Sequence, residues 1–554
     1  MKKLVLATGS AALLLLTACG GAAAPESSAS GEATSSGGEA TSSGIELVTA
    51  MPAGVGPVDN VNWNLADGEP LSLDQNLSWS GSQNFVGNLM CESLLSTTPE
   101  GGLEPGLATD VSYTDATTLV VKLREGVTFW DGSALTADDV VYSIDKARTN
   151  EVSQFVGDLA AVASVEATDA STVTIKLSEP NSLIRGALST GAGAVVSKAS
   201  AEGNTNFGLP GDTSMSCTGP YMLKEWTAGS KIVVESNPTW WNKGDGKQLT
   251  KQITFSFITD PAAAVAGYES GELDGGFLIP ASSIKALQAS TVGTLGFGDG
   301  SAFGAWVPIV NTERSMSNPK LREALAKALD YANIVATETA GAGIPAKAVG
   351  VPGSWGYEKA AYQAAWDSLP DRVTDLEAAK KLVAESGVSN PELVIAAWSE
   401  LPDSVNSALV LQQAANSVGF NATIDKIGFD RAADLYSGAK KEDIDIFATT
   451  YLSFICDPLY IYSQIGLEAG SANWGGYSNA KVSELITSAL ATTDEAERAK
   501  ITIEIQSLLV ADYAWLPTTT YPSPFFISNE LSGAIPTGPA HLWSAWAVNL
   551  GTAK

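Results

Sequence analysis

The segment REGVTFWDGSALTADDVVYS, residues 124–143, decides how the chain is to be understood, because its acidic residues allow either a catalytic loop or a structural turn. Asp131 and Gly132 are typical turn residues, and Thr136 is a typical helix N-cap followed by two acidic residues that favour the helix dipole. Carboxylates are common near the start of a helix, and no other reactive residue accompanies them here. The segment therefore predicts a turn followed by a helix, which is scaffold and not a catalytic centre.

Outward from this segment, short strands alternate with helices. Runs of β-branched residues bounded by turn formers predict strands at 117–123, 171–177, 230–236, 251–258 and 392–398. Leucines at four-residue spacing predict a buried helical stripe within 318–336, and a further helix is expected at 375–387. This alternation favours an open α/β sheet. GFGDGSAFG (296–304) has no amphipathic helix after it, so it predicts a flexible crossover between domains and not a nucleotide loop.

The N-terminal residues have the layout of an export signal. Two lysines precede an apolar run that ends in LTAC (16–19), which is too short to span a membrane. LTAC resembles the lipobox of bacterial lipoproteins, so residues 1–18 are expected to be a signal peptide and Cys19 to carry a lipid. The alternative is an ordinary signal peptide with a chance cysteine at its end. Residues 19–44 lack large apolar side chains and predict a disordered tether, so we expect an exported protein anchored to the outer face of the cell membrane.

Composition limits the partners and the chemistry. The chain has 61 acidic and 32 basic residues, a formal net charge of −29, which argues against nucleic acid or an anionic membrane surface as the main partner. Its one histidine, His541, and four scattered cysteines provide no metal-ligand spacing. GxSxG, Walker and HExxH motifs are absent from the sequence, so we expect no enzyme, no cofactor and no metal. Hydrolysis by a pair of carboxylates is the enzymatic alternative that the sequence leaves open.

Residues 104–143, EPGLATDVSYTDATTLVVKLREGVTFWDGSALTADDVVYS, closely resemble the signature region of the family 5 extracellular solute-binding proteins of ABC transporters, which include oligopeptide, dipeptide and nickel receptors. Further blocks follow in family order, so the resemblance covers nearly the whole chain after the tether. These blocks are PLSLDQ (70–75), CTGPYML (217–223), SNPTWWN (236–242), ESGELDG (269–275), VNTERSMSNPKLREALAKALD (310–330) and YSNAKVSELITSAL (477–490).

The resemblance implies an α/β fold of the two-lobed periplasmic-binding-protein type, class II or cluster C, with an extra small α/β domain in the first lobe. The lobes would close by a hinge motion around a solute held between them. The expected boundaries are 45–92, 213–300 and 521–554 for lobe I, 93–212 for the small domain, and 301–520 for lobe II.

Three segments match positions that contact ligand in the family. Trp79, Ser80 and Gly81 correspond to a segment that presents backbone groups to the ligand, and Trp306 stands where the chain enters the second lobe. The ligand-contacting loop corresponds to YLSFICD (451–457). Trp474 is expected either to form another wall of the cleft or to pack in the core.

The loop departs from the pattern of the peptide receptors. Tyr451 fills their aromatic position, but Phe454 stands where they carry the aspartate that pairs with the α-ammonium of a peptide. Free-amine peptides are therefore less secure ligands unless Asp457 substitutes for that aspartate. The alternatives are a gap in the correspondence or a Phe454 side chain that only packs.

The same family blocks suggest the disulfide and the partners. Cys91 and Cys217 each adjoin a first-lobe block, so we expect them to pair and Cys456 to stay a free, buried thiol. The implied function is that of a receptor, acting as a monomer, that delivers a small solute to an ABC permease and ATPase and meets the membrane only through its lipid. Short peptides are the most frequent family ligands, and the alternatives are a sugar, opine or heterocycle receptor, or a ligand-sensing lipoprotein without a transport role.

Overall fold

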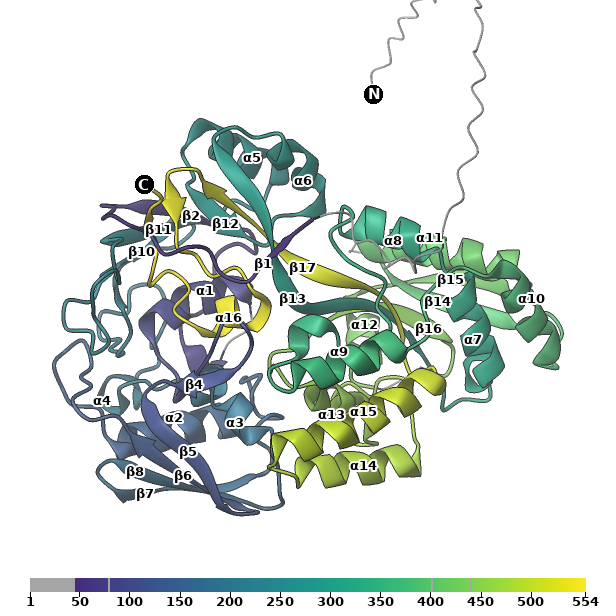
Figure 1. Ribbon diagram of the computed structural model, residues 1–554, viewed down its shortest axis with the longest axis horizontal. Helices are drawn as coiled ribbons and strands as arrows, with labels where there is room; N and C mark the ends of the chain where they lie inside the picture. The colour runs from purple at the N-terminus through teal and green to yellow at the C-terminus, as the bar shows by residue number, and fades with distance from the viewer. Residues whose placement is uncertain (1–44, 78–79, 400–401, 439–440) are drawn as a thin grey trace, which may run out of the picture. The chain divides into compact units, whose positions relative to one another are not determined.

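Two long strands, β13 (Gly293–Pro308) and β17 (Leu516–Ser528), lie side by side at the centre of one sheet (Figure 1). The computed structural model describes residues 45–554 except 78–79, 400–401 and 439–440. The strand pair divides the sheet into a β2 side and a β14 side. The two strands hydrogen-bond along most of their length. On the outer edges of this pair, β13 pairs with β16 toward the β14 side and β17 pairs with β12 toward the β2 side.

Within the described residues the sheet has eleven strands in the order β15-β14-β16-β13-β17-β12-β2-β11-β10-β9, and β1 pairs with β13. Along β11, Ile253 and Phe255 are buried and their neighbours are half-buried, as the two-residue period of a strand requires. The remaining strands of this sheet are β1 (Leu47–Val48), β2 (Val61–Leu65), β9 (Tyr221–Thr227), β10 (Lys231–Ser236), β11 (Gln252–Ser256), β12 (Gly275–Phe277), β14 (Glu392–Trp398), β15 (Asn421–Ile427) and β16 (Ile446–Leu452).

The β2 side has an aromatic core. Trp63 and Phe277 lie with ring centroids 5.0 Å apart, and Trp546 contacts both rings. The surrounding elements include residues from both ends of the chain. They are α1 (Gly81–Met90), α5 (Pro261–Ser270), α6 (Ala281–Gln288), α16 (Gly538–Trp543), β18 (Leu531–Ser532) and β19 (Gly551–Thr552).

A separate four-stranded antiparallel sheet has the order β5-β6-β8-β7, and residues 124–143 follow its strand β6 and lead into α2 (Ala137–Thr149). The carboxylate of Asp139 accepts hydrogen bonds from the backbone N–H (3.0 Å) and hydroxyl (2.7 Å) of Thr136, so the predicted helix start is present at α2. Asp131 accepts from Ser133 in an exposed turn. The elements here are β3 (Leu95–Thr97), β4 (Leu103–Pro105), β5 (Ala108–Asp115), β6 (Thr118–Leu123), α2 (Ala137–Thr149), β7 (Val162–Asp169), β8 (Thr172–Leu177), α3 (Ile184–Ala187) and α4 (Lys198–Ala201).

The β14 side carries most of the helices. The predicted stripe within 318–336 is divided between α7 and α8, because Asp330 accepts from the N–H of Asn333 and starts a second helix. The helices are α7 (Pro319–Ala328), α8 (Tyr331–Glu338), α9 (Lys359–Ser368), α10 (Leu376–Glu385), α11 (Pro402–Ser417), α12 (Phe429–Tyr436), α13 (Pro458–Gly466), α14 (Ala480–Leu490) and α15 (Glu495–Ala511).

The expected flexible crossover at 296–304 is instead part of β13, so that expectation was wrong. A Cβ at Gly298 would lie 2.0 Å from the carbonyl oxygen of Pro536, and one at Gly300 would lie 2.0 Å from that of Tyr521. These glycines therefore permit close backbone packing and do not mark a loose linker. The lobe boundaries expected after residues 300 and 520 fall inside β13 and β17.

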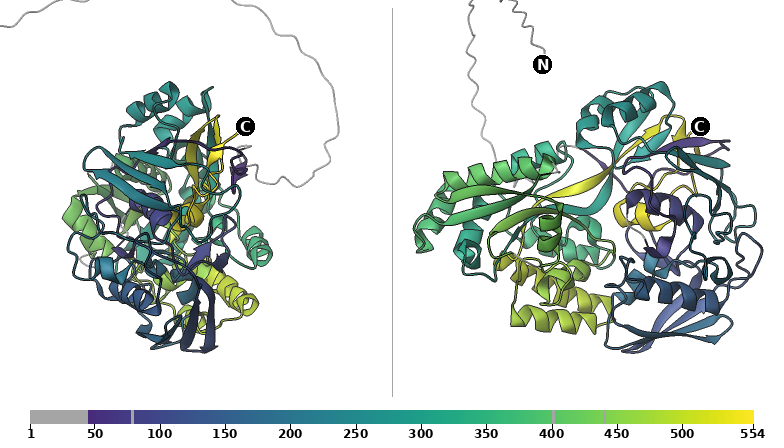
Figure 2. Two further views of the ribbon diagram at one scale, coloured as in Figure 1. Left: turned by 90° about the vertical axis from the view of Figure 1, so that its left-hand side faces the viewer. Right: turned by 180° about the vertical axis from the view of Figure 1, so that it is seen from behind.

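The small sheet and its helices lie beside α13 and α14 in both directions of view (Figure 2). The backbone N–H of Ser182 donates to the carbonyl of Leu490 at 2.7 Å, and Tyr460 donates its hydroxyl proton to Asp158 at 3.0 Å. The small α/β part is thus joined to the β14 side directly. Among the described residues, the structure contains no helix with the length and apolarity needed to cross a membrane.

Candidate functional site

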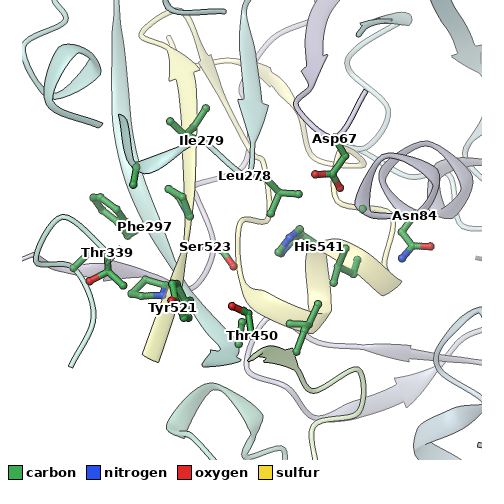
Figure 3. A pocket seen from close by; sticks show the side chains of 18 of the residues that line it. Asp67, Asn84, Leu278, Ile279, Phe297, Thr339, Thr450, Tyr521, Ser523 and His541 are labelled. Atoms are coloured by element: carbon green, nitrogen blue, oxygen red, sulfur yellow. The ribbon is translucent and has the colours of Figure 1, made fainter. Parts of the chain in front are cut away.

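A cavity of about 440 Å³ lies where the β2 side and the β14 side meet around β17 (Figure 3). This volume falls in the range of small-molecule sites, roughly 300–1,000 Å³. Its lining draws on distant parts of the chain, including Asp67, Ser80, Gly81, Glu338, Phe454 and His541. A second cavity of about 660 Å³ adjoins it on the β14 side, and both are lined by Ala281, Glu338, Thr450 and Tyr521. Together they form one cleft along the central strands.

The N-terminus of α1 forms one wall of the first cavity. Ser80 caps this helix by accepting from the N–H of Gln83. The carboxylate of Asp67 lies over the same end, where the N–H groups of Gly81 and Ser82 donate to it. Loss of water around the carboxylate outweighs these two bonds and raises the pKa of Asp67. A Cβ at Gly81 would lie 2.8 Å from Oδ2 of Asp67, so glycine is needed for this approach.

His541 belongs to α16 and is only 2% exposed. Its ring stacks on Phe85 with centroids 5.2 Å apart, and its Nδ1 lies 2.8 Å from the carbonyl of Thr537. Because a carbonyl only accepts, Nδ1 must carry the proton. Burial lowers the pKa of His541 to about 4, so the ring is neutral near pH 7. Its Nε2 is thus an acceptor, and it has no partner among the described residues.

The opposite wall comes from the β14 side and from β17. Tyr521 donates its hydroxyl proton to Glu338, at the end of α8, over 2.5 Å. Phe454 packs its ring edge-on against Trp543, with centroids 5.9 Å apart. Figure 3 shows Asp67 and His541 turned toward the same space, with Thr450 and Tyr521 across it. The described residues that line the two cavities include two carboxylates, and no lysine or arginine.

Residues 102–473 match the family described as bacterial extracellular solute-binding proteins, family 5, middle. The chain belongs to this family. The glutathione-binding protein GsiB of Escherichia coli (strain K12) is 27% identical over 473 residues, which cover 82% of this chain and 87% of GsiB. The substrate-binding protein CtaP of an ABC transporter from Listeria monocytogenes superposes with a TM-score of 0.75 at 21% identity, covering 90% of this chain and 100% of CtaP. NikA from Staphylococcus aureus, in complex with Ni(L-His)2, superposes with a TM-score of 0.68 at 19% identity, covering 87% of this chain and 98% of NikA.

Membership defines the broad function of this family 5 protein. It is an extracytoplasmic substrate-binding receptor of an ABC importer and not an enzyme. The predicted α/β fold of the periplasmic-binding type is confirmed by the match to solved structures of such proteins. The domain boundaries and the individual ligand contacts stay predictions.

In this family 5 protein, the predicted site residues fall into three groups. Ser80, Gly81 and Phe454 line the first cavity, and Trp306 lines the second. The lining of both cavities omits three of the predicted residues, Tyr451, Asp457 and Trp474. Trp79 and Cys19 lie outside the described residues.

Tyr451 and Trp474 belong to an aromatic cluster behind the cleft. Trp474 stacks on Trp515 with centroids 5.4 Å apart and planes at 28°, and Tyr451 meets Trp515 edge-on at 6.1 Å. The hydroxyl of Tyr451 also bonds to Gln464. Trp474 is partly buried and packs against the core, and its expected role as a wall of the cleft stays a prediction. Burial raises the pKa of Tyr451 well above its ordinary range.

Asp457 has a structural environment of its own. Its carboxylate accepts from the N–H of Leu459 at 2.9 Å, as the N-cap of α13, and from the hydroxyl of Tyr357 at 3.1 Å. Arg498 lies 3.2 Å away, and both charged side chains are 7% exposed. Desolvation raises the pKa of Asp457 despite this arginine. The carboxylate thus already has a buried cationic partner and two hydrogen-bond donors, and its expected role as a substitute for the aspartate of the peptide receptors stays a prediction.

Sequence reasoning missed Asp67, Glu338 and His541 as cleft residues. The sequence assigned His541 no role in ligand binding, whereas α16 packs against α1 and brings it to the cavity wall. The sequence signal that could have pointed to His541 is that it is the one histidine of the chain. Asp67 and Glu338 have no local pattern that distinguishes them from other surface acids.

The cysteines agree with the expected pairing. Cys91 and Cys217 form a disulfide at the two ends of the segment that contains the small sheet. Cys456 is a free thiol, and burial raises its pKa to about 12, which makes it unreactive near neutral pH.

Proposed function

We propose that this protein is a lipid-anchored receptor that captures a small solute in the cleft along β13 and β17 and delivers it to the permease and ATPase of an ABC importer. The observation that carries the proposal is the composition of the first cavity. Its walls combine the start of α1, the end of α8 and the C-terminal α16, which lie on both sides of the central strand pair. A solute bound there would contact both sides at once and would stabilise a closed arrangement.

The anchor rests on the sequence. LTAC (16–19) followed by a tether without large apolar residues supports lipidation of Cys19 and a binding unit held close to the membrane. Replacement of Cys19 by serine should move the protein from the membrane fraction to the soluble or secreted fraction. The intact mass of the wild-type mature chain should exceed the polypeptide mass from Cys19 onward by a diacylglycerol-sized increment, and an unmodified N-terminal mass would contradict the anchor.

The lobes are proposed with the boundaries expected from the sequence, 45–92, 213–300 and 521–554 against 301–520. Strand β13 crosses the boundary after residue 300 and β17 crosses the boundary after residue 520, so these two strands would supply the hinge. The extra domain at 93–212 would belong to the first lobe, to which the Cys91–Cys217 disulfide attaches its two ends.

The solute class is best tested with the native chain. Native mass spectrometry of protein purified without denaturation, followed by fragmentation of released molecules, should reveal a bound small molecule. A ladder of masses that differ by amino-acid residues would identify a general peptide receptor, the ligand class most frequent in the family. A single non-peptide mass would favour the opine, sugar or heterocycle alternative, which the apolar Phe454 in the cavity supports.

Transport is tested by deletion. A strain that lacks the gene should lose uptake of the solute identified in this way, and the wild-type gene should restore it. Unchanged uptake would contradict the transport role and would favour a ligand-sensing lipoprotein.

A further inference from the structure

We infer that the first cavity selects a solute with a protonated primary amine, whose N–H groups are bound by Asp67 and His541 on one wall while Glu338 supplies negative charge from the other. This inference rests on the proposed function, because it names the class of solute that the same cleft captures. It differs from the arrangement of the peptide receptors, in which the ammonium partner is the loop residue that is Phe454 here.

The first step is the charge of the cleft. Among the described residues that line it, Asp67 and Glu338 are acidic and none is lysine or arginine. An anionic solute would lose its hydration without gaining a cationic partner, which is strongly unfavourable in a closed site. A cationic solute would instead find negative charge in the exposed carboxylate of Asp67 and the half-buried one of Glu338. The raised pKa of Asp67 is consistent with such an under-compensated carboxylate.

The second step concerns the helix terminus. The N-terminus of a helix usually favours anions, because its first N–H groups have no partner in the helix. At α1 this position is already occupied, since Gly81 and Ser82 donate their N–H groups to Asp67. The start of α1 is therefore satisfied internally and is not open to a solute carboxylate.

The third step is the unpartnered acceptor. His541 donates from Nδ1 to Thr537, so its neutral ring offers only the lone pair of Nε2. This atom has no partner among the described residues, although the side chain is 2% exposed and lines the cavity. A buried acceptor without a donor is destabilising, and a donor brought by the solute removes that penalty. A primary ammonium has three N–H donors, so one head group carries enough donors for Nε2 and for the carboxylate of Asp67, which lines the same cavity.

The fourth step defines the rest of the solute. Leu278, Ile279, Phe297, Leu452 and Phe454 line the same cavity. Their apolar surface fits a compact hydrocarbon or aromatic body and offers nothing to a second charged group. The other polar residues of the same lining, which include Asn84, Gln154, Thr339, Thr450 and Ser523, are uncharged, so the expected solute has one ammonium head, a largely apolar body and no second charged group.

The test uses the full chain and two sets of matched probes. The first set is 2-phenylethylamine, 2-phenylethanol and phenylacetate, and the second is hexylamine, hexanol and hexanoate. Thermal denaturation and calorimetric titration should show that the amines bind and raise the melting temperature, while the alcohols and acids do not. Asp67→Asn should weaken amine binding roughly ten- to hundredfold, the range for a charge-assisted hydrogen bond. The asparagine oxygen can still accept from the start of α1.

Two further variants separate binding from folding. His541→Asn keeps a donor for Thr537 but removes the Nε2 acceptor, so it should weaken amine binding without abolishing it. Asp260→Asn is the matched control, because Asp260 is an exposed helix-capping aspartate at the start of α5 and is not part of the lining of either cavity. It should leave amine binding unchanged.

Equal binding of alcohols, or preferential binding of acids, would overturn the inference while leaving the receptor function intact. Amine binding that is unaffected by both Asp67→Asn and His541→Asn would overturn it as well. A failure of all six probes also overturns it, and the uptake defect of the deletion strain then decides separately whether the receptor function stands.

Discussion

The one histidine of the chain allows a direct test of how strongly the cavity wall is shielded from water. Burial lowers the pKa of His541 to about 4, whereas an unfolded chain has a histidine pKa near 6.5. Between these values the unfolded chain binds a proton that the folded chain does not bind. The contribution of His541 to the free energy of unfolding is therefore intact at pH 8 and decreases as the pH falls below 6.5.

The size of this effect follows from the two pKa values. At pH 5 the unfolded histidine is almost fully protonated and the folded one is mostly neutral, which removes about 2 kcal/mol relative to pH 8. Other groups titrate in the same range. The pKa values of Glu92 and Asp158 are each raised to about 7 by burial, and these carboxyls stabilise the folded chain as the pH falls. Because they are present in wild type and His541→Asn alike, the difference between the two proteins isolates the histidine.

Two measurements check the prediction. In protein labelled with ¹³C at histidine, the single imidazole signal should titrate near pH 4, and His541→Asn should abolish the signal. In urea denaturation, the stability advantage of wild type over His541→Asn should shrink by about 2 kcal/mol between pH 8 and pH 5. An imidazole signal that titrates near 6.5, with a stability difference independent of pH, would refute the buried neutral histidine on which the cavity chemistry depends.

Three further predictions concern the scaffold and the helix start. Arg498→Met should destabilise the protein by about 3–5 kcal/mol in urea denaturation, because it leaves Asp457 as an uncompensated buried charge, and adding Asp457→Asn should restore part of the loss. Replacement of Cys91 and Cys217 by serine opens a 126-residue separation and should cost up to about 5 kcal/mol of stability, so a change below 1 kcal/mol would contradict it. Gly81→Ala places a Cβ 2.8 Å from Asp67 Oδ2 and should weaken binding of the amine probes with little change in the melting temperature of the free protein.

The sequence predicted the local features of the fold well. Thr136 and Asp139 are three positions apart and hydrogen-bond to each other, so the start of α2 could be predicted from the local sequence alone. The glycine-rich stretch within β13 could not, because Gly298 and Gly300 are required by backbone segments more than 200 residues away. Asp457 shows both cases. Its N-cap role at the start of α13 follows from a local pattern, an aspartate before a proline, whereas a role in ligand binding would depend on long-range packing.

The candidate site was predictable only in part for the same physical reason. Gly81 and Phe454 were found through family blocks that occupy contiguous stretches of sequence. Asp67 and His541 both line the cavity because α1 and α16 pack together and the loop after β2 lies at the start of α1, and no short segment of sequence predicts that packing. Long-range contacts of this kind need a structure.

The contacts between the small α/β part and the β14 side have a consequence for cleft opening. Tyr460 donates to Asp158 at 3.0 Å, and Ser182 bonds to the end of α14. The disulfide attaches this part to the β2 side, so the hinge motion proposed about β13 and β17 would have to break the Tyr460 and Ser182 contacts to open the cleft from this arrangement. Each such hydrogen bond is worth about 0.5–1.5 kcal/mol, enough to shift the balance between open and closed forms several-fold. Under the proposed hinge, the small part would influence solute affinity by favouring the arrangement described here, in addition to Gln154, its own residue in the lining of the first cavity.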